Sequence, residues 1–318
     1  MKICMIEPIA VSEELLKELT RPLEQAGHEV ELCLEILSED EKRTRAEKAD
    51  VLIVANGRLT GGFVERAEKL KLISVAFTGV DHLPKETCVG RGITVCNAQG
   101  YATIAVRDLV FGFVFGLLRN LVACDEIVRQ GGTKDGLVGN EIFGKTFGII
   151  GYGQIGRAVA EVAAVLGCNV LAYSRSAKLG QTDGKATFVT FDEVITKSDI
   201  ISLHTPLTPE TKGMIGQAEF EKMKPQAILI NTARGQVVDS ASLVNALNSG
   251  QIAAAGIDVF DVEPPLGLDE PLFTAKNVLM APHIGFATKE SMIKRAGIVF
   301  DNIEKWIEGS PQNVCFTT

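Results

Sequence analysis

The sequence lacks the features that mark several large classes of protein. Its seven cysteines are odd in number, scattered, and form no C-x-x-C pair, so their spacing favours neither a disulfide framework nor a zinc site. We interpret them as reduced, mostly buried side chains of a cytoplasmic protein, and we predict no metal site. The most apolar stretch, residues 109–118, is too short to cross a bilayer as a helix. The first residues lack the longer apolar region and the small-residue cleavage site of a signal peptide.

Basic charge is also scarce. The chain has 32 lysines and arginines against 40 aspartates and glutamates, and its net charge is −8. A protein that binds nucleic acid or an anionic membrane needs a basic surface, so both partners are disfavoured. Hydrophobic residues make up 46% of the 318 residues and charged residues 23%. This composition is typical of a globular protein, and the length is sufficient for two domains.

The chain contains two series of short apolar runs that alternate with helical patterns. The first series predicts strands at 2–7, 30–36, 50–55, 70–77 and 93–98, with helices at 12–27 and 61–69. The second predicts strands at 146–151, 169–174, 199–204, 227–233, 254–260 and 277–283, with helices at 154–167, 217–223 and 239–248. A last helix is predicted at 288–309, with Thr288 as its cap. Continuous apolar strands that alternate with helices indicate parallel sheets covered on both faces.

We therefore expect an α/β fold of two doubly wound parallel-sheet domains. Residues 1–98 and 288–318 are predicted to form one of them. Residues 99–287 are predicted to form a Rossmann domain that binds a dinucleotide. A long helix is predicted over 101–128, where Gly112 and Gly116 lie one turn apart between phenylalanines. These glycines suit either tight packing inside the domain or packing on a second subunit. We favour a homodimer through this helix, because a helix that is apolar on several faces needs cover on all of them.

The stretch GYGQIG at 151–156 follows a predicted strand directly and opens a predicted helix. In that context Gly151 suits a tight turn, Gly153 lets the backbone approach a pyrophosphate, and Gly156 lets the helix pack closely on the strand. A plain strand-to-helix turn is the alternative. The pattern predicts a dinucleotide site.

The end of the next strand indicates which dinucleotide binds. An acid is usual near position 174, where it accepts hydrogen bonds from the ribose hydroxyls of NAD, but this chain has Ser174 followed by Arg175. Serine removes the repulsion of a 2′-phosphate, and arginine can pair with one. The stretch thus favours NADP(H) over NAD(H). The alternative is that Arg175 points into solvent and NAD still binds.

Three charged or titratable residues follow three later strands of the second series. They are Arg234, Glu263 and His283. Because the carboxyl ends of parallel strands form one ligand edge, we expect them to converge. Arg234 presents a planar fork of donors that suits a carboxylate. His283 can give a proton to a carbonyl oxygen as a hydride reaches the carbon, while Glu263 accepts a hydrogen bond from the other ring nitrogen.

Five stretches together resemble the D-isomer-specific 2-hydroxyacid dehydrogenase family. They are GYGQIG, LHTPLTPET, LINTARGQVVD, GIDVFDVEPP and APHIGFAT. The resemblance implies that Arg234, Glu263 and His283 are the catalytic set and that Asp258 holds the nicotinamide amide. The predicted cofactor-binding residues are Gly151, Gly153, Gln154, Ile155, Gly156, Ser174, Arg175, Ser176, His204, Thr205, Pro206, Thr211, Thr232, Ala233, Asp258 and Gly285. The predicted substrate residues are Thr78, Gly79 and Val80 in the loop TGVDHL, with Tyr101 and Phe286, which resemble an aromatic pair of D-lactate dehydrogenases.

The resemblance implies that the two domains have a cleft between them and that residues 1–98 and 288–318 form a flavodoxin-like substrate or catalytic domain. It further implies an enzyme that transfers a hydride between NAD(P)H and a small 2-oxo acid, and hence a small-molecule partner. Glyoxylate or hydroxypyruvate is the expected substrate, because Ser174 and Arg175 are similar to the pair in NADPH-using reductases of those acids. A longer or aromatic 2-oxo acid is the second choice. Two further alternatives stay open: a dinucleotide-sensing binding protein similar to the C-terminal-binding corepressors, and a phosphite dehydrogenase. Formate dehydrogenases typically carry glutamine where this chain has Glu263.

Overall fold

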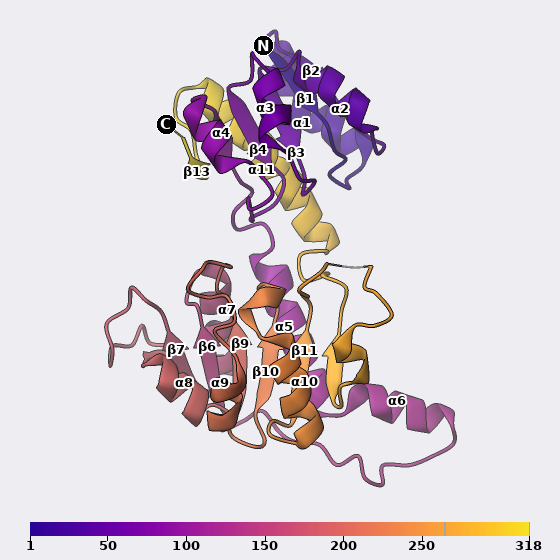
Figure 1. Cartoon of the computed structure of the whole chain (residues 1–318), viewed down its shortest axis with the longest axis vertical. Helices are drawn as coiled ribbons and strands as arrows, with labels where there is room; N and C mark the ends of the chain where they lie inside the picture. Colours follow the sequence, from indigo (N-terminus) through magenta and orange to yellow (C-terminus); the bar gives the residue numbers. More distant parts are fainter. Residues whose placement is uncertain (264, 318) are drawn as a thin grey trace. The chain divides into compact units, whose positions relative to one another are not determined.

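The structure is a computed structural model that describes residues 1–263 and 265–317. It divides into two compact units (Figure 1). Unit 1 comprises Met1–Ala102 together with Ala287–Thr318, and unit 2 comprises Thr103–Phe286. Each unit is built on its own sheet, so the predicted α/β fold of two parallel-sheet domains is confirmed. The assignment of substrate to one unit and dinucleotide to the other remains a prediction.

Unit 1 contains a six-stranded sheet in the order β13-β5-β4-β3-β1-β2. Its strands are β1 (Lys2–Met5), β2 (Glu29–Glu31), β3 (Val51–Val54), β4 (Leu72–Val75), β5 (Thr94–Cys96) and β13 (Val314–Phe316). All pair in parallel except β13, which the sequence analysis missed and which runs antiparallel to β5. The helices are α1 (Glu13–Gln25), α2 (Glu39–Ala46), α3 (Gly61–Arg66), α4 (Lys85–Gly90) and α11 (Lys289–Ile307). Thr288 caps α11 as predicted, because its side chain accepts a hydrogen bond from Ser291 N.

Unit 2 contains a seven-stranded parallel sheet in the order β12-β11-β10-β9-β6-β7-β8. Its strands are β6 (Thr146–Ile150), β7 (Asn169–Tyr173), β8 (Thr187–Phe188), β9 (Ile200–Leu203), β10 (Ile228–Asn231), β11 (Ala254–Ile257) and β12 (Val278–Met280). The helices are α5 (Thr103–Leu118), α6 (Leu121–Arg129), α7 (Gln154–Val165), α8 (Phe191–Lys197), α9 (Gln217–Lys222) and α10 (Ser240–Ser249), with 3-10 turns at Gly235–Val237 and Pro271–Thr274. The strand order reverses between β6 and β9, which is where doubly wound folds bind dinucleotides.

The prediction of a single helix over 101–128 is wrong. The structure breaks it into α5 and α6 at Asn120, whose φ of 51° is left-handed. Asparagine tolerates this conformation, and its side chain donates to Leu137 O at 3.3 Å. Most of α5 packs inside unit 2, where Gly116 faces Leu279. No helix in the described part of the chain is both long and apolar enough to cross a membrane.

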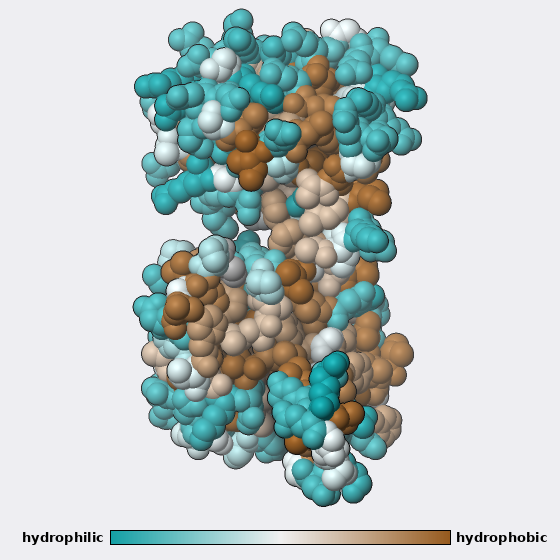
Figure 2. Space-filling model, turned by 90° about the vertical axis from the view of Figure 1, so that its right-hand side faces the viewer, coloured by the Kyte–Doolittle hydropathy of each residue, from teal (hydrophilic) through white to brown (hydrophobic). Residues whose placement is uncertain are grey.

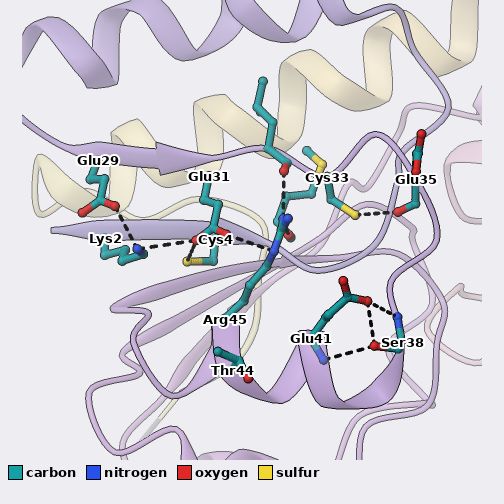
Figure 3. Close-up of polar contacts among 12 residues, drawn as sticks. Lys2, Cys4, Glu29, Glu31, Cys33, Glu35, Ser38, Glu41, Thr44 and Arg45 are labelled. Carbon is teal, nitrogen blue, oxygen red and sulfur yellow. Dashed lines mark hydrogen bonds and ion pairs between the residues drawn. The ribbon is translucent and has the colours of Figure 1, made fainter.

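All seven cysteines are unpaired, and four of them are buried. Cys4 lies in a polar cluster that joins β1, β2 and α2 (Figure 3). Its thiol contacts Glu31 Oε2 at 3.6 Å, and burial raises its pKa to about 12. Arg45 closes the cluster, because its Nε lies 3.0 Å from Glu31 Oε1 and its Nη1 donates to Met5 O and Leu32 O. A thiol that stays protonated is a poor nucleophile, so Cys4 has a structural role.

Candidate active site

The predicted catalytic and cofactor residues all lie at the carboxyl edge of the unit 2 sheet. The glycine loop follows β6, Ser174 follows β7, and His204 follows β9. Arg234 comes after β10, while Glu263 and His283 come after β11 and β12. The last three strands are immediate neighbours in the sheet. The sheet order therefore brings the three predicted catalytic residues to adjacent strand ends.

The three glycines after β6 differ in what fills the space around them. Gly151 has a φ of +98°, and a Cβ there would lie 2.5 Å from His204 O. A Cβ on Gly156 would lie 2.2 Å from Gly151 O. Both positions therefore require glycine for the protein's own packing. A Cβ on Gly153 would meet no protein atom within 4 Å. Gly153 is the N-cap of α7, and the open space around its backbone leaves room for a ligand, so the loop fits a pyrophosphate.

A pocket of about 360 Å³ opens beyond the end of β7. Its lining residues include Ser174 and Ser176, the cations Arg157 and Lys178, and the ring of Tyr152. The Arg157 guanidinium lies 5.7 Å from the centre of that ring, and the Tyr152 hydroxyl donates to Asp183 Oδ2 at 2.7 Å. Sequence reasoning selected the serines and Arg175 but missed both lining cations. Their signals were present, since Arg157 follows the third glycine directly and Lys178 stands two residues after Ser176.

The segment after β9 holds a neutral histidine. Burial lowers the pKa of His204 to about 3, and its Nε2 lies 2.9 Å from Ser202 Oγ. His204 N donates to Ile150 O at 2.7 Å, which ties this segment to the end of β6. Thr211 has a structural role in the same loop, because its hydroxyl donates to Pro206 O at 2.7 Å and accepts from Thr208 N.

The turn after β10 packs tightly on the end of β11. A Cβ on Gly235 would lie 2.0 Å from the carbonyl carbon of Phe260, so the Arg234 turn reaches the segment that leads to Glu263. Asn231 Nδ2 donates to Arg234 O at 2.9 Å, which fixes the backbone from which the half-buried Arg234 projects. The Thr232 hydroxyl is buried and has no hydrogen-bond partner among the residues that the structure describes. A buried hydroxyl without a partner at the carboxyl edge of the sheet suits a hydrogen bond to a polar ligand such as a dinucleotide.

Asp258 fixes the turn that carries His283. Its two carboxylate oxygens accept hydrogen bonds from Ile284 N and Gly285 N, each at 2.8 Å. Its carbonyl oxygen accepts from His283 N at 2.8 Å. Asp258 is only 1% exposed, and burial raises the pKa of its carboxyl. These bonds hold His283 at a φ of +55°, a left-handed conformation that is unfavourable for a residue with a Cβ.

His283 and Glu263 are in direct contact. The distance from His283 Nδ1 to Glu263 Oε2 is 2.7 Å, and both side chains are partly exposed. With the carboxylate accepting from Nδ1, the tautomer leaves Nε2 as the nitrogen that can exchange a proton with a ligand. Phe286 packs edge-on against the imidazole, with ring centres 5.7 Å apart.

The other predicted substrate residues belong to unit 1. Thr78, Gly79 and Val80 follow β4, and Val80 packs partly against the unit 1 core. Tyr101 follows β5, is 4% exposed, and lies edge-on to Phe77 with ring centres 6.3 Å apart. Tyr101 and Phe286 thus come from different units, and their joint contact with a substrate stays a prediction.

Comparison with known proteins agrees with this geometry. A family described as "D-isomer specific 2-hydroxyacid dehydrogenase, NAD binding domain" matches residues 111–285. A glyoxylate reductase of Thermococcus litoralis is 40% identical over 281 residues, covering 85% of this chain and 84% of the relative. The chain belongs to this family. A hydroxypyruvate reductase of Blautia hydrogenotrophica is 34% identical over 284 residues, covering 86% of this chain and 87% of that protein.

A solved structure also covers both units of this dehydrogenase. An acyclic imino acid reductase in complex with NADPH and D-Arg has a TM-score of 0.89 and 29% identity, covering 99% of this chain and 100% of that one. The family match and the two relatives confirm the resemblance to the D-2-hydroxyacid dehydrogenases. The protein is an NAD(P)-dependent oxidoreductase of 2-oxo and D-2-hydroxy acids. The family match and the named relatives favour this enzyme over a corepressor-like binding protein and over a phosphite dehydrogenase.

Proposed function

We propose that this dehydrogenase reduces glyoxylate or hydroxypyruvate with NADPH, and that Arg234, Glu263 and His283 carry the chemistry. The contact of 2.7 Å between His283 Nδ1 and Glu263 Oε2 is the observation that carries the proposal. An imidazole with one nitrogen held by a carboxylate, at the ligand edge of a dinucleotide-type sheet, is suited to proton transfer. The names of the relatives, glyoxylate reductase and hydroxypyruvate reductase, support the choice of substrate.

Each residue has one task in this proposal. The nicotinamide, when bound, supplies the hydride that reaches the carbonyl carbon. His283 gives the proton on Nε2 to the carbonyl oxygen, and Glu263 stabilises the imidazole that carries it. Arg234 donates to the substrate carboxylate, for which a planar guanidinium is suited. Asp258 holds the His283 turn in place, because its carboxylate accepts hydrogen bonds from two backbone amides of that turn.

The experiment that tests the proposal is a panel of substrates with both cofactors. Purified protein is mixed with glyoxylate, hydroxypyruvate, pyruvate or phenylpyruvate, each with NADPH and with NADH, and nicotinamide absorbance is followed. We expect fast oxidation with the first two acids. Turnover of phenylpyruvate alone would replace the proposed substrate by an aromatic 2-oxo acid. No oxidation with any pair would contradict the proposed reaction.

The preference for NADPH rests on the pocket beyond β7. Ser174 and Ser176 contribute no negative charge there, while Arg157 and Lys178 contribute two positive charges. A 2′-phosphate gains from both features. The substitution Ser174→Asp should move the preference from NADPH toward NADH. Arg175→Ala is the matched comparison, because Arg175 does not line this pocket, and it should change the ratio less. A Ser174→Asp protein that keeps its NADPH preference would contradict this assignment.

We also propose that a second copy of the chain covers α6. This helix has no buried residue, and Leu121, Val122 and Val128 are each more than half exposed. Figure 2 shows brown, apolar surface over much of unit 2 on the side from which α6 projects. A pocket of about 470 Å³ beside it is lined by Val122, Val138 and the amino ends of β10 to β12. An apolar surface of this kind marks an interaction site.

The oligomeric state tests that second proposal. Light scattering on a sizing column should give a dimer for the native protein and a monomer for Val122→Asp. Ile36→Asp in unit 1 is the control, because Ile36 is 88% exposed and lies outside the proposed interface. A native monomer would refute the dimer, and so would dissociation by both variants alike.

A further inference from the structure

Helix α11 carries a buried cation in unit 1. Arg295 is 2% exposed and Asn302 is fully buried. The two residues are seven positions apart, so they lie on the same face of the helix. Buried arginines are normally paired with a carboxylate. Within residues 1–263 and 265–317, Arg295 has no such partner, and its Nε makes no hydrogen bond.

Two aromatic rings and one carbonyl group surround this guanidinium, which also hydrogen-bonds to the Tyr101 side chain. Its Cζ lies 4.7 Å from the centre of Phe77 and 5.7 Å from the centre of Tyr101. One terminal nitrogen donates to Ile9 O at 2.5 Å. Burial lowers the pKa of the group, so the protein retains a charge whose desolvation is unfavourable. If Arg295 served only to fill the core, an apolar side chain of similar volume would stabilise unit 1 at least as well.

The three groups around Arg295 have a common location. Ile9, Phe77 and Tyr101 follow β1, β4 and β5, so they lie at the carboxyl edge of the unit 1 sheet. Phe77 immediately precedes Thr78, and Tyr101 is itself a predicted substrate residue. A cation against both rings restricts how they can turn. Arg295 is therefore placed to fix the orientation of Tyr101.

A separate hydrogen-bond chain holds the loop that begins at Thr78. Asn302 Nδ2 donates to Asn97 O at 2.9 Å, and Asn97 Nδ2 donates to Thr78 O at 2.7 Å. This chain does not include Arg295. Different side chains of α11 thus hold the backbone of the loop and the ring of Tyr101. Substitution of Arg295 should therefore change the position of the ring without releasing the loop.

We propose that Arg295 is a specificity-determining positioning residue, which holds the Tyr101 ring where it contacts the side chain of the 2-oxo acid. This inference rests on the proposed function. Glyoxylate has only a hydrogen on its carbonyl carbon, whereas hydroxypyruvate has a hydroxymethyl group there. Loss of Arg295 should therefore weaken the use of hydroxypyruvate and spare the use of glyoxylate.

The test compares the two acids in matched variants. Arg295→Met replaces the cation by an apolar chain of similar length. Arg295→Lys keeps the charge but loses the planar group that stacks on the rings. Ser74→Ala is the control, because the Ser74 hydroxyl also joins α11 to the sheet, donating to Val299 O at 2.9 Å, but it does not contact the rings. For each variant kcat and KM are measured with both acids, along with the melting temperature.

Arg295→Met should raise KM for hydroxypyruvate by up to about tenfold, because the loss of ring orientation can cost no more than the cation–π contact that maintained it. KM for glyoxylate should stay within about twofold, and kcat for glyoxylate should be unchanged. Arg295→Lys should show a smaller rise, and Ser74→Ala should leave the ratio of the two KM values at the native level. Tyr101→Phe keeps the ring but removes the hydroxyl that hydrogen-bonds to Arg295, so Arg295→Met in that background should produce a smaller but still selective rise.

Three results would overturn the inference while the native enzyme remains active. They are an equal change for both acids, an Arg295→Met protein with native KM values, and a Ser74→Ala protein with the same shift in ratio. If Arg295→Met fails to fold, native KM values for the Arg295→Lys protein would overturn it. A native enzyme inactive on every acid would instead overturn the proposed function.

Discussion

Replacing Asp258 by asparagine should lower both stability and turnover, because this side chain holds the turn that carries His283. The native carboxylate accepts two backbone hydrogen bonds of 2.8 Å in a site that is 1% exposed. Asparagine has the same shape but only one acceptor oxygen. Its amide group would face either Ile284 N or Gly285 N, so two donors would meet and one buried amide would lose its partner.

The loss in the free energy of unfolding follows from the number of hydrogen bonds that change. A hydrogen bond to a charged group contributes about 1.5–3 kcal/mol, and one such bond is lost while the other becomes a neutral bond. We therefore expect a loss of about 2–4 kcal/mol in the free energy of unfolding. In a unit of this size, each kcal/mol corresponds to about 2–4 °C in melting temperature. The turn would also lose the bonds that hold His283 at positive φ, and a misplacement of about 1 Å can lower turnover by about 100-fold.

The assay pairs Asp258→Asn with a control at the opposite end of the same sheet. Asp199 accepts from Thr146 N and Lys224 Nζ, both at 2.8 Å, directly before β9. Asp199→Asn should lose comparable stability, measured by thermal unfolding, and should keep its kcat. Asp258→Asn should lose kcat as well. The reasoning would be refuted by an Asp258→Asn protein with native kcat, or by equal kcat losses in both variants.

Three further predictions concern the same edge of unit 2. Gly153→Ala should weaken NADPH binding, measured by fluorescence titration, and should lower the melting temperature only slightly, since alanine is less favourable at the N-cap of α7. Gly156→Ala should lower the melting temperature much more, because its Cβ would overlap a backbone oxygen. The pKa of His204 is about 3 when folded and 6.5 when unfolded, so the unfolded chain takes up a proton first as pH falls. The contribution of the neutral His204 to the free energy of unfolding is complete above pH 6.5 and falls toward pH 3 by at most about 1.4 kcal/mol per pH unit. His204→Gln should therefore make the free energy of unfolding in urea depend less on pH between pH 7 and 5. Glu263→Gln should lower kcat by about 10- to 100-fold with little change in melting temperature, because the carboxylate no longer stabilises the protonated His283.

Most of the fold could be predicted because its strands are buried on both faces. Strands such as β3 and β11 are continuous apolar runs, and such runs are visible in a sequence without any tertiary information. The exceptions are short or depend on distant contacts. Strand β8 has only two residues at the sheet edge, and β13 is an antiparallel partner supplied by the far end of the chain. The break at Asn120 depends on its contact with Leu137, which local helix patterns do not reveal.

The sequence predicted which strand ends carry the residues of the candidate site, but it did not predict the local geometry of those residues. Neighbouring parallel strands bring their carboxyl ends together, so the approach of Glu263 and His283 followed from strand order. The sequence does not reveal the left-handed turn at His283 or the carboxylate of Asp258 that supports it, because both depend on the path of the chain after β12. Arg157 and Lys178 were missed for a similar reason, since only the folded loop after β7 shows which cations line the pocket.

The most direct test of the account is single-turnover reduction of glyoxylate by the native protein and by His283→Asn, each saturated with NADPH. Asparagine can still hydrogen-bond to Glu263 but cannot deliver a proton. The account predicts unchanged NADPH affinity and a hydride-transfer rate lower by at least about 100-fold. A His283→Asn protein that oxidises bound NADPH at the native rate would show that proton transfer does not pass through this histidine.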